Sequence, residues 1–301
     1  MPAPSRVLVT GARGFLGRQV SAELLRRFAG AEIVAVSRRP ASADDHPGPT
    51  LDLSQAAAWR ELGGYFDWVL HLAARVPSFQ ASATDDALYL ANVLPSLHLI
   101  DATQSWRPSR LIYVSSISVY PMGAAPVLHE GLVPRPDTFY GAAKLAGEHL
   151  AALTAASGAG VVVLRLSSLY GPGQAAGTVL PLFIANAAAG KPIGLIAGGT
   201  RTQDFLHMAD AARGIVDAAA SQATGVYNLA SGAATSMLEL AHVITALPRW
   251  KVEIIDRGGT EHSPSVKVDI SKAQRDWAYA PGISLREGIG SYHAALLAGM
   301  S

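Results

Sequence analysis

Three glycines stand directly after a short apolar segment near the start of the chain, and they constrain its fold more than any other feature. Arg6 to Thr10 reads as a buried strand, and a helical pattern runs from Gln19 to Phe28. Between them stand Gly11, Gly14 and Gly17. Glycines at this spacing permit a tight turn, a close approach of backbone to a pyrophosphate, and close packing of the helix on the strand. The helix N-terminus adds free amides and the positive end of a dipole. The sequence therefore predicts a dinucleotide-binding βα unit.

Strand and helix patterns alternate through the rest of the first half of the chain. Further strands are predicted at Glu32 to Ser37, Thr50-Leu51, Asp67 to Leu72, Arg110 to Ser115 and Val161 to Leu166, with helices near 54–62, 84–105 and 138–156. Such alternation implies right-handed crossovers and a parallel sheet covered by helices on both faces. Ligands of such sheets bind at the carboxyl ends of the strands.

The pattern becomes less regular after Tyr170-Gly-Pro-Gly173. Helices are predicted near 179–189, 208–220, 237–247 and 284–297, and strands near 193–196 and 226–229. We therefore predict an α/β protein with a doubly wound, parallel Rossmann sheet and a smaller C-terminal α+β domain that binds substrate. Residues 1–168 would form the Rossmann domain, with 202–225 returning to it, and residues 169–201 and 226–301 would form the smaller domain.

The composition is that of a folded, enzyme-sized protein and excludes several other classes. With 301 residues, of which 50% are hydrophobic and 16% charged, the chain can bury a large core. The formal net charge is +1 without a dense run of lysine and arginine, so no nucleic-acid partner is expected. There is no cysteine, no His-x-x-x-His spacing, no charged-then-apolar leader and no apolar run near ~18 residues. We expect no metal site, no membrane association and a cytoplasmic location.

The end of the second predicted strand bears on which cofactor is bound. An acidic residue about twenty positions after the glycine loop would bind the ribose hydroxyls of NAD. Here Ser37 stands, followed by Arg38 and Arg39. A guanidinium suits a 2′-phosphate, and Arg13 in the glycine loop could reach the same group. The pattern favours NADP and leaves NAD possible, because arginine outnumbers lysine 19 to 5 and an exposed arginine pair is unsurprising.

Tyr140 and Lys144 form a second motif, Tyr-x-x-x-Lys. On a helix, positions i and i+4 share one face, so the phenol and the ammonium would project together. A nearby positive charge favours phenolate and would lower the tyrosine pKa from ~10 towards the range useful for proton exchange with an alcohol or ketone. The alternative is a packed tyrosine beside a solvated lysine.

Taken together and in order, these motifs resemble the extended short-chain dehydrogenase/reductases, the NAD-dependent epimerase/dehydratase group, whose best-known members act on nucleotide sugars. The matching segments are Thr10 to Gly17, Asp52-Leu53, His71 to Ala74, Asn92-Val93, Ser115 to Tyr120, Tyr140 with Lys144, Leu169 to Pro172, Asp204 to Asp210, Tyr227 to Ser231 and Asp269 to Lys272. The resemblance covers nearly the whole chain. It implies an NAD(P)-dependent oxidoreductase, and a homodimer that pairs the helices near 84–105 and 138–156.

The resemblance also implies roles for individual residues. Ser116 would be the catalytic hydroxyl, with Ser115 as the alternative, Tyr140 the acid/base, and Lys144 the residue that lowers the tyrosine pKa and binds the nicotinamide ribose. Two donors, one able to release its proton, suit the charge that develops on a carbonyl oxygen. The cofactor-binding residues expected from motifs and resemblance are Gly11, Arg13, Gly14, Phe15, Leu16, Gly17, Ser37, Arg38, Arg39, Asp52, Leu53, Leu72, Ala73, Ala74, Asn92, Tyr140 and Lys144. Asn92 would stiffen the site, or equally make a hydrogen bond at a helix start.

Departures from the family pattern reduce the number of reactions that this chain is expected to catalyse. The related 4,6-dehydratases carry an Asp-Glu pair where this chain has Ile117 and Ser118, and fucose-synthase-like enzymes use a cysteine that this chain lacks. The remaining reactions are reduction of a keto group on a nucleotide sugar, favoured by NADP, and 4-epimerisation by an enzyme that retains NAD. A reductase of a small ketone or aldehyde and a non-catalytic NADP-sensing scaffold stay open.

The expected substrate-binding residues are Ser116, Ser168, Arg201 and Arg257. Ser168 stands where many nucleotide-sugar enzymes have an asparagine, and Arg201 is displaced by two residues from the usual arginine position. Arg257 is the remaining phosphate-binding candidate.

Overall fold

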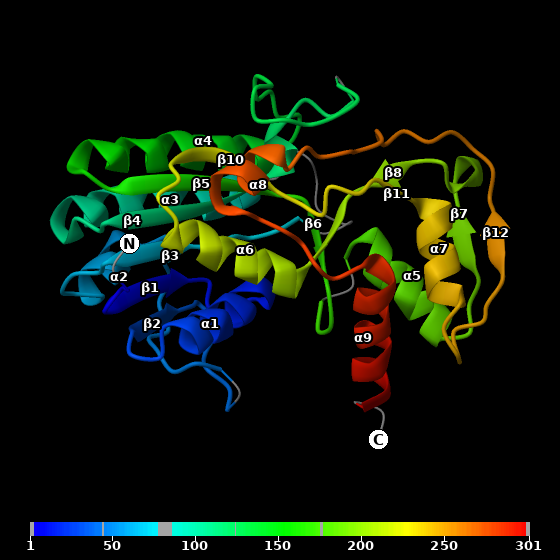
Figure 1. Cartoon of the computed structure of the whole chain (residues 1–301), viewed down its shortest axis with the longest axis horizontal. Helices are drawn as coiled ribbons and strands as arrows, with labels where there is room; N and C mark the ends of the chain where they lie inside the picture. Colours follow the sequence, from blue (N-terminus) through cyan, green and yellow to red (C-terminus); the bar gives the residue numbers. More distant parts are fainter. Residues whose placement is uncertain (1–2, 44, 78–85, 124, 175–176, 299–301) are drawn as a thin grey trace.

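The computed structural model describes residues 3–43, 45–77, 86–123, 125–174 and 177–298, and its larger part is a six-stranded parallel sheet (Figure 1). The strand order is β10-β5-β4-β3-β1-β2. The strands are β1 (Arg6–Thr10), β2 (Glu32–Val36), β3 (Trp68–His71), β4 (Arg110–Ser116), β5 (Gly160–Leu166) and β10 (Gly225–Leu229). The order reverses between β1 and β3, so a crevice opens there at the carboxyl ends of the strands. The predicted doubly wound Rossmann sheet is confirmed.

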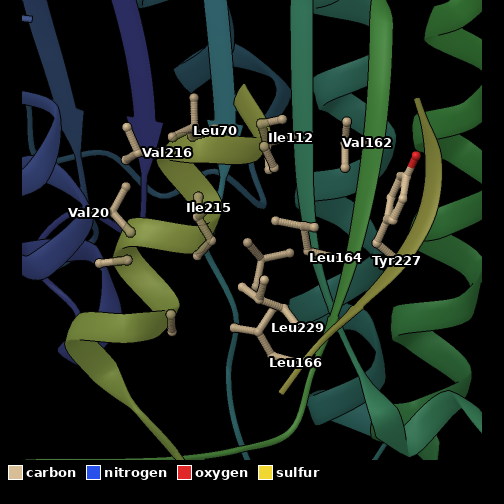
Figure 2. Packing of buried hydrophobic residues seen from close by; sticks show 14 of the residues in the cluster. Val20, Leu70, Ile112, Val162, Leu164, Leu166, Ile215, Val216, Tyr227 and Leu229 are labelled. Atoms are coloured by element: carbon tan, nitrogen blue, oxygen red, sulfur yellow. The ribbon is translucent and has the colours of Figure 1, made fainter. Parts of the chain in front are cut away.

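Helices cover both faces of this sheet. They are α1 (Phe15–Arg27), α6 (Met208–Ala220), α2 (Ala56–Glu61), α3 (Asp86–Trp106) and α4 (Phe139–Leu153). Side chains of β1 alternate between two cores: Val7 and Val9 pack in the core with α1 and α6, and Leu8 packs in the core with α2 and α3. Figure 2 shows Val20 and Ile215 meeting the sheet in the first core. Burial on both faces explains the nearly continuous apolar strands of the sequence.

The smaller part of the molecule lies at the carboxyl ends of the sheet strands and has its own core. It contains α5 (Val179–Ala188), α7 (Met237–Thr245), α9 (Leu285–Ala298) and the strand pairs β7 (Ile193–Leu195) with β12 (Ile254–Asp256), β8 (Thr202–Gln203) with β11 (Thr235–Ser236), and β6 (Ser168–Tyr170) with β9 (Phe205–His207). Tyr170, Phe183 and Leu240 are among its buried residues. Short 3-10 turns occupy Ile117–Val119, Thr154–Ser157 and Ala197–Gly199.

Several predicted boundaries change. The sequence places residues 226–229 in the smaller domain, but β10 pairs in parallel with β5 and belongs to the main sheet. Helix α8 (Ser271–Trp277), which no pattern predicted, packs beside β10. Thr50-Leu51 is not a strand, since Thr50 makes only an isolated bridge to Ser37. Of the predicted helix 84–105, residues 84 and 85 lie outside the described residues. None of the helices in the described ranges is long and apolar enough to cross a membrane.

Candidate active site

A cavity of about 920 Å³ lies between the main sheet and the smaller part of the molecule. One end is lined by the glycine loop and by the residues that follow β2 and β3. The other end is lined by the end of β4, by α4, and by segments of the smaller part near 174, 177–180, 201–205 and 263–266. The cavity therefore joins a cofactor-sized groove to a second space over the carboxyl ends of β4 and β5.

The glycine loop has the geometry that its sequence predicts. Gly11 adopts a left-handed φ of +70°, and a Cβ there would stand 2.8 Å from the backbone of Ala73. A Cβ on Gly17 would stand 2.1 Å from the carbonyl oxygen of Gly11. Neither position tolerates a side chain without moving backbone. Gly14 is the N-cap of α1 and has no side-chain cap, so the first amides of this helix face the cavity unblocked. These residues fit a dinucleotide pyrophosphate.

The three arginines near the end of β2 have different surroundings. Arg13 is only 3% exposed, and it donates to the carbonyl of Arg39 at 2.6 Å, to Thr50 Oγ1 at 3.0 Å and to the carbonyl of Gly48. Its guanidinium thus ties the loop after β2 to the glycine loop. Arg13 lines the cavity as expected, but three of its five N–H groups donate to protein acceptors, so its guanidinium is less available to a 2′-phosphate than that of an arginine without such bonds.

Arg39 is held as well. It donates to the carbonyl of Arg13 at 2.7 Å and forms an ion pair with Asp45 at 3.2 Å. Arg38, by contrast, is exposed, lines the cavity, and makes no hydrogen bond or ion pair within the described ranges. Hydrogen bonds from Ser54 hold the pKa of Asp52 below its usual range, with a smaller contribution from the charge of Arg38. Arg38 is therefore the cation most available to an added phosphate.

At the other end of the groove, Ser116, Tyr140 and Lys144 line the cavity together. Ser116 ends β4, and its Oγ accepts from the Ser118 amide at 3.1 Å and contacts Ser118 Oγ at 3.1 Å. Tyr140 lies in the first turn of α4, which begins after the N-cap Thr138. Lys144 lies one turn further, and its Nζ donates to the Val114 carbonyl at 2.9 Å. Strand end and helix start thus bring a hydroxyl, a phenol and an ammonium to one place.

Burial has the largest influence on the pKa of both Tyr140 and Lys144. It raises the pKa of Tyr140 to about 12, against a lowering by the hydrogen bond from Ser116. It lowers the pKa of Lys144 to about 8, against a raising by the charge of Glu148. The expectation that Lys144 brings the tyrosine pKa towards neutrality is not met here, because the ammonium donates to a carbonyl of β4 and burial of the phenol is the largest influence on its pKa.

Two expected residues, Asn92 and Ser115, use their polar side-chain atoms in hydrogen bonds within the protein. Asn92 is buried, and its amide bonds the backbone amide and carbonyl of Arg75 at 3.0 Å each, as well as the Leu88 carbonyl. It does not line the cavity, which corrects its assignment as a cofactor-binding residue; it holds the backbone of the segment that follows Ala74. Ser115 directs its hydroxyl to Glu148 at 2.5 Å. That leaves Ser116 as the hydroxyl beside Tyr140.

The substrate side contains residues that sequence reasoning named and others that it missed, Gln203 among them. Ser168 and Arg201 line the cavity, and Gln203 connects them: its Nε2 donates to Ser168 Oγ, and its Oε1 accepts from Arg201 Nη1 at 3.0 Å. Gln203 lies between Arg201 and Asp204, and this position in the displaced arginine segment is the sequence feature that could have indicated a substrate-binding role. Arg257 follows β12, is exposed, and does not line the cavity, which corrects its assignment as a substrate-binding residue.

The described lining of the cavity is poor in acidic side chains. Among the described lining residues Asp52 is the one carboxylate, and it lies at the adenosine end of the groove. Within the same ranges, no group of histidine and carboxylate side chains could hold a metal ion. The reacting end of the described cavity thus offers hydroxyls, a phenol and an ammonium.

Comparisons with known proteins identify the family of this chain. A family model for the NAD-dependent epimerase/dehydratase family matches residues 7–230. The chain is 29% identical to the dTDP-L-rhamnose 4-epimerase of Burkholderia thailandensis, over 95% of this chain and 93% of that protein. It is 30% identical to a dTDP-glucose 4,6-dehydratase of Streptomyces griseus, over 95% and 92%. The structure of MoeE5 with UDP-glucuronic acid and NAD matches with a TM-score of 0.84 at 31% identity, over 98% and 99%.

The fold and the matches define an enzyme, an NAD(P)-dependent oxidoreductase of the extended short-chain dehydrogenase/reductase type. Within that class, the chain belongs to the NAD-dependent epimerase/dehydratase family.

Proposed function

We propose that this enzyme moves a hydride reversibly between NAD and one secondary alcohol carbon of a nucleotide sugar, with 4-epimerisation as the net reaction. The observation that carries the proposal is the meeting of Ser116, Tyr140 and Lys144 at a described cavity end that has no carboxylate. The compared proteins include a dTDP-sugar 4-epimerase and a structure holding a UDP-sugar with NAD, which supports both the substrate class and the cofactor.

Each of the three residues has one task in this proposal. The phenolic oxygen of Tyr140 takes the proton from the sugar hydroxyl during oxidation and returns it during reduction. The hydroxyl of Ser116 donates a hydrogen bond to the same sugar oxygen, where charge develops. The ammonium of Lys144 holds the ribose of the cofactor next to Tyr140. The bound nicotinamide supplies reversible hydride acceptance.

Dehydration fits this cavity poorly, although one relative is a 4,6-dehydratase. Elimination of water from a sugar ring needs a general acid and a general base at neighbouring carbons. At the positions where those dehydratases carry their acidic pair, this chain has Ile117, which is buried, and Ser118, which hydrogen-bonds Ser116. Oxidation of a single carbon followed by return of the hydride to it does not require an acidic pair of this kind.

Reduction of a keto-sugar by NADPH is the second candidate, and the exposed Arg38 at the cavity favours it. In the sequence, Arg13, Arg38 and Arg39 together favour NADP. In the structure, Arg13 and Arg39 donate hydrogen bonds to backbone carbonyls of the protein. NAD is therefore the preferred cofactor in this proposal.

We further propose a cytoplasmic homodimer. The leucines Leu90 and Leu97 on α3 and Leu153 on α4 are 49%, 42% and 59% exposed, respectively. Large apolar side chains on two adjacent helices suit a symmetric helix–helix interface.

The proposal is tested by giving the purified enzyme a panel of UDP- and dTDP-sugars and following each by NMR. An epimerase produces a mixture of two 4-epimers without added cofactor and without net formation of NADH. Consumption of NADPH with a keto-sugar, and no epimerisation, would support the second candidate. Conversion of no sugar in either assay would oppose both.

A further inference from the structure

Glu148 is a buried carboxylate directly behind the reacting group. It lies on α4 and is 5% exposed. Its Oε1 accepts from Ser115 Oγ at 2.5 Å and from Arg165 Nε at 3.0 Å, and its Oε2 accepts from Arg165 Nη2 at 2.6 Å. Three charge-assisted hydrogen bonds in a buried setting fix this side chain in one position.

The elements joined by Glu148 are those that carry the proposed reaction. Ser115 precedes Ser116 on β4, and Arg165 on β5 lies three residues before Ser168. We propose that Glu148 is a positioning residue: it ties α4 to the ends of β4 and β5 and supplies the negative charge that faces Lys144 one helical turn away. The inference depends on the proposed function for the role of Lys144.

The surroundings of Lys144 explain why one carboxylate matters. The ammonium is 1% exposed, and the groups that face it are the Val114 carbonyl and the Tyr113 ring of β4, His71 of β3, Tyr140 one turn earlier, and Glu148 with its partner Arg165 of β5. Burial and the charge of Lys144 keep the pKa of His71 at about 3, so the imidazole is neutral. Among these groups the anion is Glu148.

The direction of the effect follows from these charges. Burial lowers the pKa of Lys144 to about 8, and the charge of Glu148 raises it. If the carboxylate becomes an amide of the same shape, the pKa of Lys144 falls further and the ammonium loses its proton at a lower pH. Cofactor affinity that depends on the charged ammonium is then lost at a lower pH as well.

The experiment measures NADH binding by fluorescence from pH 6 to 10, which requires neither substrate nor turnover. In the wild type we expect affinity to fall through a step near pH 8, the pKa of Lys144. Glu148→Gln should move the midpoint down by about one pH unit. Glu148→Asp keeps the charge, so its midpoint should stay close to that of the wild type. A shift of the same size in Glu148→Asp and Glu148→Gln would overturn the electrostatic role.

Two controls separate the possible failures. Asp210→Asn removes another buried carboxylate, which pairs with Arg213 on α6, and should lower stability without moving the midpoint. Lys144→Met should abolish the step. If Lys144→Met leaves the step in place, the proposed role of Lys144 fails. If Lys144→Met removes the step but folded Glu148→Gln leaves the midpoint unchanged, only the inference about Glu148 fails. Should Glu148→Gln not fold, Glu148→Asp decides: a midpoint lowered by a full unit despite the retained charge overturns the inference.

Discussion

Replacing Arg13 with methionine should destabilise the protein without changing its choice between NADH and NADPH. Arg13 is 3% exposed and gives three hydrogen bonds, to Arg39, Thr50 and Gly48. Hydrogen bonds from a charged donor contribute ~1.5–3 kcal/mol each, but released carbonyls recover part of this from water. A loss of about 3 kcal/mol is therefore expected, which corresponds to a fall in Tm of about 6–12 °C.

For each variant, Tm is measured by thermal unfolding, and the affinities for NADH and NADPH are measured separately. Arg39→Met removes a half-exposed side chain and its ion pair with Asp45, so it should cost about 1 kcal/mol or less. Arg38→Met should leave Tm unchanged and weaken NADPH binding alone, roughly ten- to a hundredfold. An unchanged Tm in Arg13→Met, together with a selective loss of NADPH affinity, would refute the structural role of its guanidinium.

Three further outcomes are expected. Tyr140→Phe should lower turnover by about two to four decades while NADH affinity, measured by fluorescence, stays nearly constant; half of wild-type turnover would contradict the acid/base role. Gly17→Ala should abolish tight NADH binding by calorimetry, because its Cβ would meet the Gly11 carbonyl at 2.1 Å; wild-type affinity would show that the loop can shift freely. Leu97→Glu should convert the proposed dimer to a monomer in analytical ultracentrifugation, since the side chain is 42% exposed on α3; an unchanged dimer would place the interface elsewhere.

Local sequence patterns were sufficient to predict the units in which a strand is followed by a turn and a helix. Gly11 and Gly17 predicted a close approach of backbone, and the structure has it. Ser116 and Tyr140 could be expected to meet, because one ends a strand of a parallel sheet and the other begins the next helix. Such inferences succeed because each depends on the geometry of a single βα unit.

The features that sequence reasoning missed depend on contacts between distant segments. β10 returns to the main sheet beside β5, and no property of residues 226–229 alone distinguishes that sheet from another. Whether an arginine binds ligand or protein depends on acceptors far along the chain, such as Gly48 for Arg13. The strands β8 and β11 are too short to produce a periodic pattern, so the sequence marks Gln203 only by its place between Arg201 and Asp204.

The most direct test of hydride transfer at one carbon uses a nucleotide sugar carrying deuterium at C4. The label leaves C4 with two electrons during oxidation and returns to the same carbon from the bound cofactor during reduction. We predict that both 4-epimers retain the deuterium at C4 when the reaction runs in ordinary water. Replacement of the deuterium by solvent hydrogen during epimerisation would contradict the proposed mechanism, because it would show proton exchange at C4 in place of hydride transfer.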